Sequence, residues 1–414
     1  MTRRGFLAAS AGSVGVALAQ TPPAPKRIAA IITEYWTGSH ADVLVGKYLE
    51  GWLQDGKSAG PRSKIVSMYT EHGPASDTIR PDISRSMAAK HSVPIYRTIH
   101  EALTLGGDDL AVDGVLLIGE HGRYPMNDKA QTLYPRFKMF LEITDTYRRT
   151  GQTAPIFNDK HLSYSWIKAK RMVEISEQMG FPMMAGSSVP VAHRKPAIEF
   201  PWGEKATKAV AISYSGLDIY GFHLLESLQC MVERRQGGET GVRAIQCLER
   251  DAVWKFLDDT PWARRLFDKA LTHSETLKPG MRQNVKEPAV FVIEYNDGLK
   301  AAAFLLTGAV QDFTVAIDVE GRPEPVSTLM YLQNGRPHPH FGCLAMNIEK
   351  MFETGVSTYP VKRTMLTSGM LDFALESRFQ GYKRLETPQL DIDYWVGRDS
   401  HFCVSPLMET PRSG

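Results

Sequence analysis

Carboxylate and imidazole side chains follow several apolar, strand-like runs in the first half of the sequence. They are Glu34, His40, Glu120, His121, Asp159 and His161. If those runs form one parallel sheet, their carboxyl ends meet at the edge where such sheets bind ligands. The six side chains then lie along that edge of the sheet, called the rim below, and their arrangement predicts a small-ligand site. A divalent metal is the alternative occupant, since it prefers these donors, and each residue alone also suits a solvated loop or a helix cap.

The order of elements in the first half predicts that sheet. Short apolar runs alternate with amphipathic segments, which is typical of a parallel sheet covered by helices on both faces. The expected strands are 27–33, 64–69, 93–96, 113–118, 154–158 and 181–185. The expected helices are 41–53, 83–90, 99–105, 134–149 and 165–179.

The second half has a different pattern. Short turns at 296–298 and 320–322 join neighbouring strand-like runs, which predicts a mostly antiparallel, open sheet. The expected strands are 289–295, 299–306, 314–319 and 326–332, and the expected helices are 224–234, 343–353 and 361–379. We therefore predict an α/β chain with one domain at 27–188 and an α+β domain at 189–414.

Composition excludes some classes of partner. The net charge is only +2 and basic residues are interspersed with acidic ones, so no nucleic-acid-binding surface is indicated. Beyond the N-terminus no segment is apolar enough to cross a membrane. The four cysteines, Cys230, Cys247, Cys343 and Cys403, are widely separated, and we expect buried free thiols.

The N-terminus is typical of a twin-arginine signal peptide. Arg3 and Arg4 precede a weakly apolar stretch, and the small residues Ala17 and Ala19 suit cleavage after Ala19. A proline-rich linker at 20–26 follows. We expect folded export to the periplasm or beyond by the twin-arginine machinery, without a stable membrane anchor. A short apolar helix of the fold, or a retained anchor, is the alternative.

Four stretches together resemble one enzyme family. Residues 113–118 (DGVLLI) are similar to its fourth nucleotide-domain strand, and 158–163 (NDKHLS) with 183–186 (MMAG) to its Glu-Lys-Pro motif and final strand. Residues 220–226 (YGFHLLE) are similar to its Gly-x-His-x-x-Asp motif, and the helix ending at 375–377 (LES) to its terminal helix. In order and spacing the chain resembles the Gfo/Idh/MocA oxidoreductases, which implies that the first domain is Rossmann-like.

The resemblance implies an enzyme acting on a sugar or polyol hydroxyl. Lys160 and His223 match the family residues that flank the reacting hydroxyl, where a base and a cation are needed. Residues expected near the substrate are His161, Asp218 and Glu226. Residues expected along NAD or NADP are Glu34, Tyr35, Trp36, Gly38, Glu71, Glu120, His121 and Asp159. The family also implies a homo-oligomer that associates through the outer face of the second sheet.

The sequence departs from the family at the dinucleotide fingerprint. The glycines of Gly-x-Gly-x-x-Gly correspond to Ile32, Glu34 and Thr37, which crowd a pyrophosphate, and Glu34 also repels it. Three hypotheses follow: a sugar or polyol oxidoreductase with an unusually held nicotinamide cofactor, a non-redox and possibly metal-assisted carbohydrate enzyme, or a non-catalytic binding protein.

Overall fold

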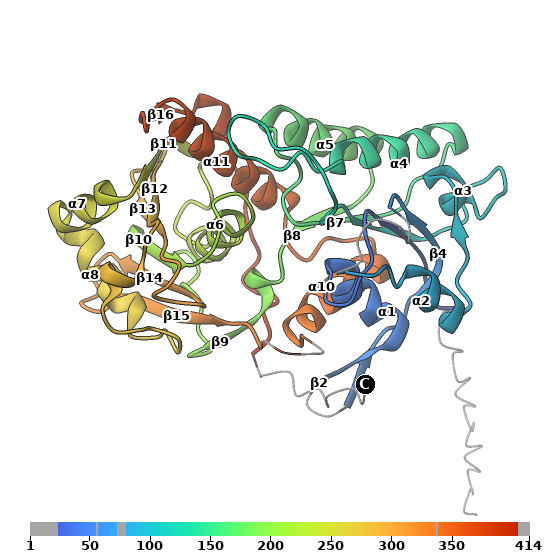
Figure 1. Cartoon of the computed structure of the whole chain (residues 1–414), viewed down its shortest axis with the longest axis horizontal. Coiled ribbons are helices and arrows are strands. Elements are labelled where there is room, and N and C mark those ends of the chain that lie inside the picture. Colours follow the sequence, from blue (N-terminus) through green and yellow to red (C-terminus); the bar gives the residue numbers. More distant parts are fainter. Residues whose placement is uncertain (1–23, 55–56, 73–79, 334, 336–337, 405–414) are drawn as a thin grey trace, which may run out of the picture.

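Two β-sheets lie side by side in the computed structural model, each with helices packed against it (Figure 1). The structure describes residues 24–54, 57–72, 80–333, 335 and 338–404. The signal peptide expected at 1–19 lies outside the described residues, as do positions 20–23 of the expected linker. Within the described ranges, no helix has the length and apolar character needed to cross a bilayer.

The first sheet is parallel and has six strands in the order β5-β4-β1-β6-β7-β8. Their bounds are β1 (Arg27–Ile32), β4 (Lys64–Thr70), β5 (Ile95–Tyr96), β6 (Gly114–Ile118), β7 (Ile156–Asp159) and β8 (Met183–Gly186). Numbered within the sheet, this order is 3-2-1-4-5-6, the order of dinucleotide-binding sheets. A small hairpin, β2 (Trp52–Gln54) with β3 (Lys57–Gly60), pairs separately.

Helices bury both faces of this sheet. Phe140 of α4 and Val115 of β6 belong to the buried cluster on one face. Ile348 of α10 and Ile28 of β1 belong to the cluster on the other, so a helix from late in the sequence helps to cover the first sheet. The elements around the sheet are η1 (Ala41–Val45), α1 (Gly46–Glu50), α2 (Ser84–His91), α3 (Ile99–Thr104), α4 (Arg136–Thr150), α5 (Trp166–Met179) and α10 (His340–Thr354).

The second sheet has eight strands in the order β16-β11-β12-β13-β10-β14-β15-β9. Neighbouring strands are antiparallel except β10 and β13, which are parallel, and β16 and β9 form its open ends. The bounds are β9 (His193–Lys195), β10 (Ala206–Ser213), β11 (Val242–Glu249), β12 (Ala289–Tyr295), β13 (Lys300–Leu305), β14 (Phe313–Val319), β15 (Val326–Tyr331) and β16 (Leu385–Glu386). The mostly antiparallel open sheet is confirmed.

Two pairs of helices cover the two faces of the second sheet (Figure 1). The inner pair is α6 (Ile219–Val232) and α11 (Val361–Phe379), and the outer pair is α7 (Asp251–Asp259) and α8 (Pro261–Leu271). Leu266 and Phe267 of α8 share a buried cluster with Val210 and Phe304 of the sheet. Helices α7 and α8 therefore cover the sheet face through which self-association is expected, and that expectation stays a prediction.

The sequence pattern predicted most, but not all, of these elements. The six first-sheet strands are confirmed, and α11 has the expected bounds. The helix expected at 41–53 ends at Glu50 and begins with a π-helical turn. Strands β10 and β11 and helices α7 and α8 were not expected. Three short elements complete the chain: η2 (Val189–Val191), α9 (Met281–Asn284) and η3 (Pro388–Leu390).

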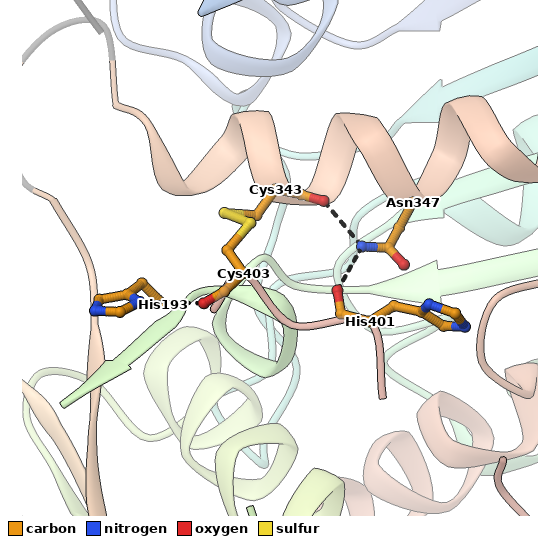
Figure 2. The surroundings of a disulfide bond; sticks show 5 residues. All are labelled: His193, Cys343, Asn347, His401 and Cys403. Atoms are coloured by element: carbon orange, nitrogen blue, oxygen red, sulfur yellow. Dashed lines mark hydrogen bonds between the residues drawn. A yellow bond between two sulfur atoms is a disulfide. The ribbon is translucent and has the colours of Figure 1, made fainter. Parts of the chain in front are cut away.

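One cysteine pair corrects the sequence-based expectation. Cys343 of α10 and Cys403 near the C-terminus form a disulfide, whereas Cys230 and Cys247 are buried free thiols. The pair is 60 residues apart in sequence, but the C-terminal segment crosses α10 and brings the Cα atoms to 6.1 Å. Figure 2 shows that Asn347 donates to the Cys343 and His401 carbonyl oxygens and so fixes the same crossing.

Candidate active site

Lys160 and His223 come together from the two halves of the chain. Lys160 directly follows β7 and His223 lies on α6, and Lys160 Nζ is 2.5 Å from His223 Nε2. Lys160 has φ +67°, and its backbone N–H donates to the Gly186 carbonyl oxygen at the end of β8. This left-handed turn lets consecutive side chains leave the strand in different directions, and Lys160 extends toward α6.

Burial changes the protonation of this pair. Desolvation lowers the pKa of Lys160, although the nearby Glu120 and Asp159 carboxylates oppose that shift. Desolvation, and then the positive charge of Lys160, holds the pKa of His223 well below its ordinary value. A neutral imidazole therefore faces an ammonium group that gives up its proton more readily than a solvated lysine.

Glu120 follows β6 and is fully enclosed by cations. Lys160 Nζ lies 3.7 Å from one carboxylate oxygen, and Arg136 at the start of α4 binds the other. Burial opposes ionisation of Glu120, but the charges of Lys160 and Arg136 together hold its pKa below the usual range. Arg136 is completely buried. It was not predicted, because an arginine at a helix start carries no distinguishing sequence pattern.

His161 belongs to the same network. Its Nε2 atom is 3.0 Å from Arg136 Nη1, and the ring packs against Phe222 of α6. Burial, and then the charge of Arg136, keeps the pKa of His161 well below its ordinary value. Three of the expected rim residues, Glu120, Asp159 and His161, thus lie around Lys160.

A second pair joins the loop after β1 to the end of β7. His40 Nδ1 is 2.7 Å from Asp159 Oδ2, and Asp159 is fully buried. The ring of His121 lies 5.6 Å from that of His40 and 4.8 Å from that of Trp36. Burial, and then the charge of His40, lowers the pKa of His121 to about 4.

Asp218 and Glu226 occupy different environments. Asp218 accepts a hydrogen bond from the Thr132 backbone N–H at 2.9 Å, and burial raises its pKa. Glu226 is 1% exposed and accepts hydrogen bonds from the Thr364 and Thr367 hydroxyls. Glu226 also accepts a hydrogen bond from the Ser187 N–H, directly after β8. Its carboxyl group is therefore occupied by partners within the protein and is not free to bind a substrate.

The residues expected along the cofactor do not lie together in one place. Tyr35 is buried in the core beneath the loop after β1, and the Arg80 guanidinium lies over the Trp36 ring at 4.7 Å. Glu34 is half-buried. Glu71 accepts a hydrogen bond from the Tyr124 hydroxyl at 2.5 Å, so an internal partner occupies the carboxylate expected to bind a ribose.

The loop after β1 does not fit the pyrophosphate of a dinucleotide. A pyrophosphate needs close backbone approach and free N–H groups at a helix start. Here the Gly38 N–H donates to Asp42 Oδ2 at 2.7 Å, and the Trp36 and Asp42 N–H groups donate to Ser39 Oγ at 3.2 Å. Two side chains of the protein already accept from these three N–H groups, Ser39 Oγ from two of them and Asp42 Oδ2 from the third.

The metal alternative gains no support from the geometry. In the part of the chain that the structure describes, no three His, Cys, Asp or Glu side chains are placed to hold an ion. The physical reason is pairing within the cleft: Glu120 is bound by two cations and Asp159 by His40.

Several buried polar atoms around Lys160 have no hydrogen-bond partner among the described residues. They are Asp159 Oδ1, Asp218 Oδ1, His121 Nε2, His161 Nδ1, His223 Nδ1 and Arg136 Nε. Buried polar atoms are normally satisfied, so a local concentration of unsatisfied donors and acceptors indicates a place for water or a polar ligand. Both donors and acceptors are present, which suits a ligand with several hydroxyl groups.

Comparisons with known proteins identify the fold. No family model and no curated protein matches the sequence. GenD2 from gentamicin A biosynthesis, solved with NAD, aligns with a TM-score of 0.55 at 13% identity over 92% of this chain and 99% of that one. The myo-inositol 2-dehydrogenase of Lactobacillus plantarum aligns with a TM-score of 0.52 at 10% identity over 87% and 99%.

A third similar structure was solved with two bound molecules. The myo-inositol dehydrogenase of Lactobacillus casei, solved with NAD(H) and myo-inositol, aligns with a TM-score of 0.52 at 10% identity over 87% of this chain and 96% of that one. At these identities the similarity establishes the fold alone, a parallel Rossmann-like sheet next to a second, mostly antiparallel sheet, which this chain shares with those NAD-bound and dehydrogenase structures.

Proposed function

We propose that this protein is an enzyme that acts on a hydroxyl group of a sugar or polyol, with Lys160 and His223 moving the hydroxyl proton. The observation that carries the proposal is the 2.5 Å contact between Lys160 Nζ and His223 Nε2, made by residues from the two halves of the chain. Such a contact places a proton donor and a proton acceptor at one point between the two halves of the chain.

The electrostatics favour this role. His223, whose pKa is held low by burial and by Lys160, is neutral near neutral pH and can accept a hydroxyl proton. Lys160, kept next to the Glu120 carboxylate at 3.7 Å, can stabilise the negative charge that develops on the substrate oxygen. The unsatisfied polar atoms around the pair offer further hydrogen bonds to a polyhydroxylated substrate.

Two reaction classes remain as candidates, and a different observation favours each. Oxidation of the hydroxyl is favoured by the fold, since similar structures are dehydrogenases and bind NAD. A redox-neutral reaction is favoured by the loop after β1, whose N–H groups are already hydrogen-bonded where a pyrophosphate would need them. NAD or NADP as a cofactor of this chain is therefore a proposal supported by the fold alone.

Product analysis of a sugar and polyol panel tests the proposal. The folded protein is incubated with myo-inositol, hexoses, hexitols and aldonates, with and without NAD or NADP, and products are followed by NMR. A product that forms together with reduced nicotinamide assigns oxidation, and a product with unchanged nicotinamide absorbance assigns redox-neutral chemistry. We expect Lys160→Met and His223→Asn to lower either turnover by about 10²- to 10⁴-fold. Full turnover in both variants would remove the proposal.

A further inference from the structure

The pair formed by His40 and Asp159 is not used by the proton transfer proposed above. His40 lies on the loop after β1, and its Nδ1 atom contacts Asp159 Oδ2 at 2.7 Å. Asp159 directly precedes Lys160 in sequence. The two consecutive residues thus hold two histidines, His40 from the first-sheet side and His223 from α6.

His40 is partly exposed beside the residues that surround Lys160. Its side chain is 15% exposed, whereas the Asp159 side chain that holds it is completely buried. The charge of His40 influences the pKa values of His223, Glu120 and His121, so it lies within electrostatic range of the whole cluster. The ring is fixed from the side by an edge contact with Phe341 at 5.3 Å.

A buried carboxylate that binds one imidazole nitrogen determines the chemistry of the other. When Asp159 accepts the Nδ1 proton, His40 Nε2 is left as a proton acceptor, and the carboxylate stabilises the imidazolium that forms. Within the described part of the chain, His40 Nε2 has no protein hydrogen-bond partner. A purely structural ion pair would need neither an exposed edge nor a free second nitrogen.

We propose that His40, oriented by Asp159, is a second acid–base group of this cleft, and that the cleft dehydrates a sugar acid or keto sugar without an external oxidant. This inference rests on the proposed function, because Lys160 and His223 still act at a substrate hydroxyl, to which the pair here supplies a proton. The inference extends the proposed function in two ways. It assigns His40 as the base that removes a carbon-bound proton, and it assigns the reaction to the redox-neutral class.

The reaction balances with the groups present. His40 Nε2 removes the proton from a carbon next to a carbonyl or carboxylate group, and the C–H electron pair forms a C=C bond. The C–O bond of the neighbouring hydroxyl breaks, and the oxygen leaves as water with a proton from the Lys160–His223 pair. Because the deprotonated carbon also carries a hydroxyl, the product is an enol, which becomes a ketone by taking a proton from solvent at carbon and releasing one from oxygen. Carbon undergoes no net oxidation, His40 returns its proton to solvent, and the Lys160–His223 pair takes a proton back from solvent.

Deuterium exchange tests the role of His40. The protein is incubated in D2O with D-gluconate, D-mannonate or D-fructose and no added nucleotide, and loss of the substrate C–H signal and formation of the keto product are followed by NMR. We expect His40→Gln to slow both at least 100-fold, with substrate affinity changed less than about threefold. His273→Gln, a half-buried histidine at the end of α8, serves as the control. Undiminished exchange in His40→Gln would overturn the inference.

A second measurement needs no substrate turnover. Diethyl pyrocarbonate modifies neutral imidazole nitrogens, and mass spectrometry gives a rate for each histidine. We expect His40 to react at least as fast as His273, and Asp159→Asn to slow His40 at least fivefold while His273 is unchanged. An unreactive His40 in the folded wild-type protein would also overturn the inference. If His40→Gln abolishes turnover while Lys160→Met and His223→Asn do not, the proposed function fails and the assignment of His40 survives.

Discussion

Lys160 Nζ and His223 Nε2 lie 2.5 Å apart although 63 sequence positions separate the two residues. Non-covalent contacts nearby hold the two halves of the chain together. The loop that follows β6 is bound to the second half by the Thr132 N–H to Asp218 and by Lys129 Nζ to Asp372 Oδ1 at 2.5 Å. The contact is therefore accompanied by further hydrogen bonds and ion pairs between the two halves of the chain.

The pH dependence of turnover should report on this pair. The pKa of His223 lies well below 6.5, so the acidic limb of kcat should fall well below the pH at which a free histidine titrates. The pKa of Lys160 is lowered from 10.5, so an alkaline limb should appear below that value as the ammonium group is lost.

Lys160→Arg separates these two limbs, because arginine keeps its proton over the accessible range. We expect a kcat about 10²- to 10³-fold lower and no alkaline limb. Lys278→Arg, at an exposed position, is the matched control. An alkaline limb that persists in Lys160→Arg would assign that limb to another group.

Arg136 should be essential for stability as well as for the site. It is fully buried and binds both Glu120 and His161, so Arg136→Met leaves the buried Glu120 carboxylate with Lys160 as its remaining cation. We expect a loss of about 3–5 kcal/mol in the free energy of unfolding, measured by urea denaturation. Adding Glu120→Gln to Arg136→Met should recover part of that loss, and an additive double variant would contradict the coupling.

Some of this site could be predicted from sequence and some could not. The rim formed by Glu120, Asp159 and Lys160 follows from strand ends, since parallel strands bring their carboxyl ends to one edge. The positions of Arg136 and of the His40–Asp159 pair could not be predicted. They depend on how the long loop after β6 and the loop after β1 fold over that edge of the sheet. The outer helices α7 and α8 were not predicted, because they lie between the antiparallel neighbours β11 and β12, which a short turn usually joins.

Glu226 should give the protein a specific pH dependence of stability. Burial raises its pKa to about 7 from an ordinary value of 4.5. The neutral acid is favoured in the folded state, so its stabilising contribution is complete below about pH 4.5 and is lost as the pH rises through about 7. A shift of roughly 2.5 pH units corresponds to about 3 kcal/mol.

Glu226→Gln mimics the neutral acid and should remove this component. Urea denaturation at pH 4.5, 6 and 7.5 measures it as the difference between wild type and variant, and that difference should grow in favour of the variant as the pH rises. Glu275→Gln, on the exposed surface, controls for the loss of a charge. A difference that stays constant with pH would show that folding does not shift the pKa of Glu226.

The outer face of the second sheet should behave as core and not as a subunit interface. Phe267 is 3% exposed and packs in the cluster that joins α8 to the sheet. We expect Phe267→Ala to lower the free energy of unfolding by about 3–5 kcal/mol and to leave the mass measured by light scattering unchanged. A smaller assembly with unchanged stability would instead place Phe267 between subunits.

Export and the disulfide should be linked in one experiment. We propose that the chain is exported through its paired arginines, and the Cys343–Cys403 disulfide supports this, because such bonds persist in oxidising compartments. Replacing Arg3 and Arg4 with lysine should retain the protein in the cytoplasm. Thiol labelling after denaturation should then count four free cysteines in the retained protein and two, Cys230 and Cys247, in the exported one.

Closing a loop of 60 residues contributes roughly 4 kcal/mol, so the retained form should also unfold at a lower urea concentration. Unchanged accumulation outside the cytoplasm would contradict the route, whereas four free thiols in exported protein would contradict the disulfide alone.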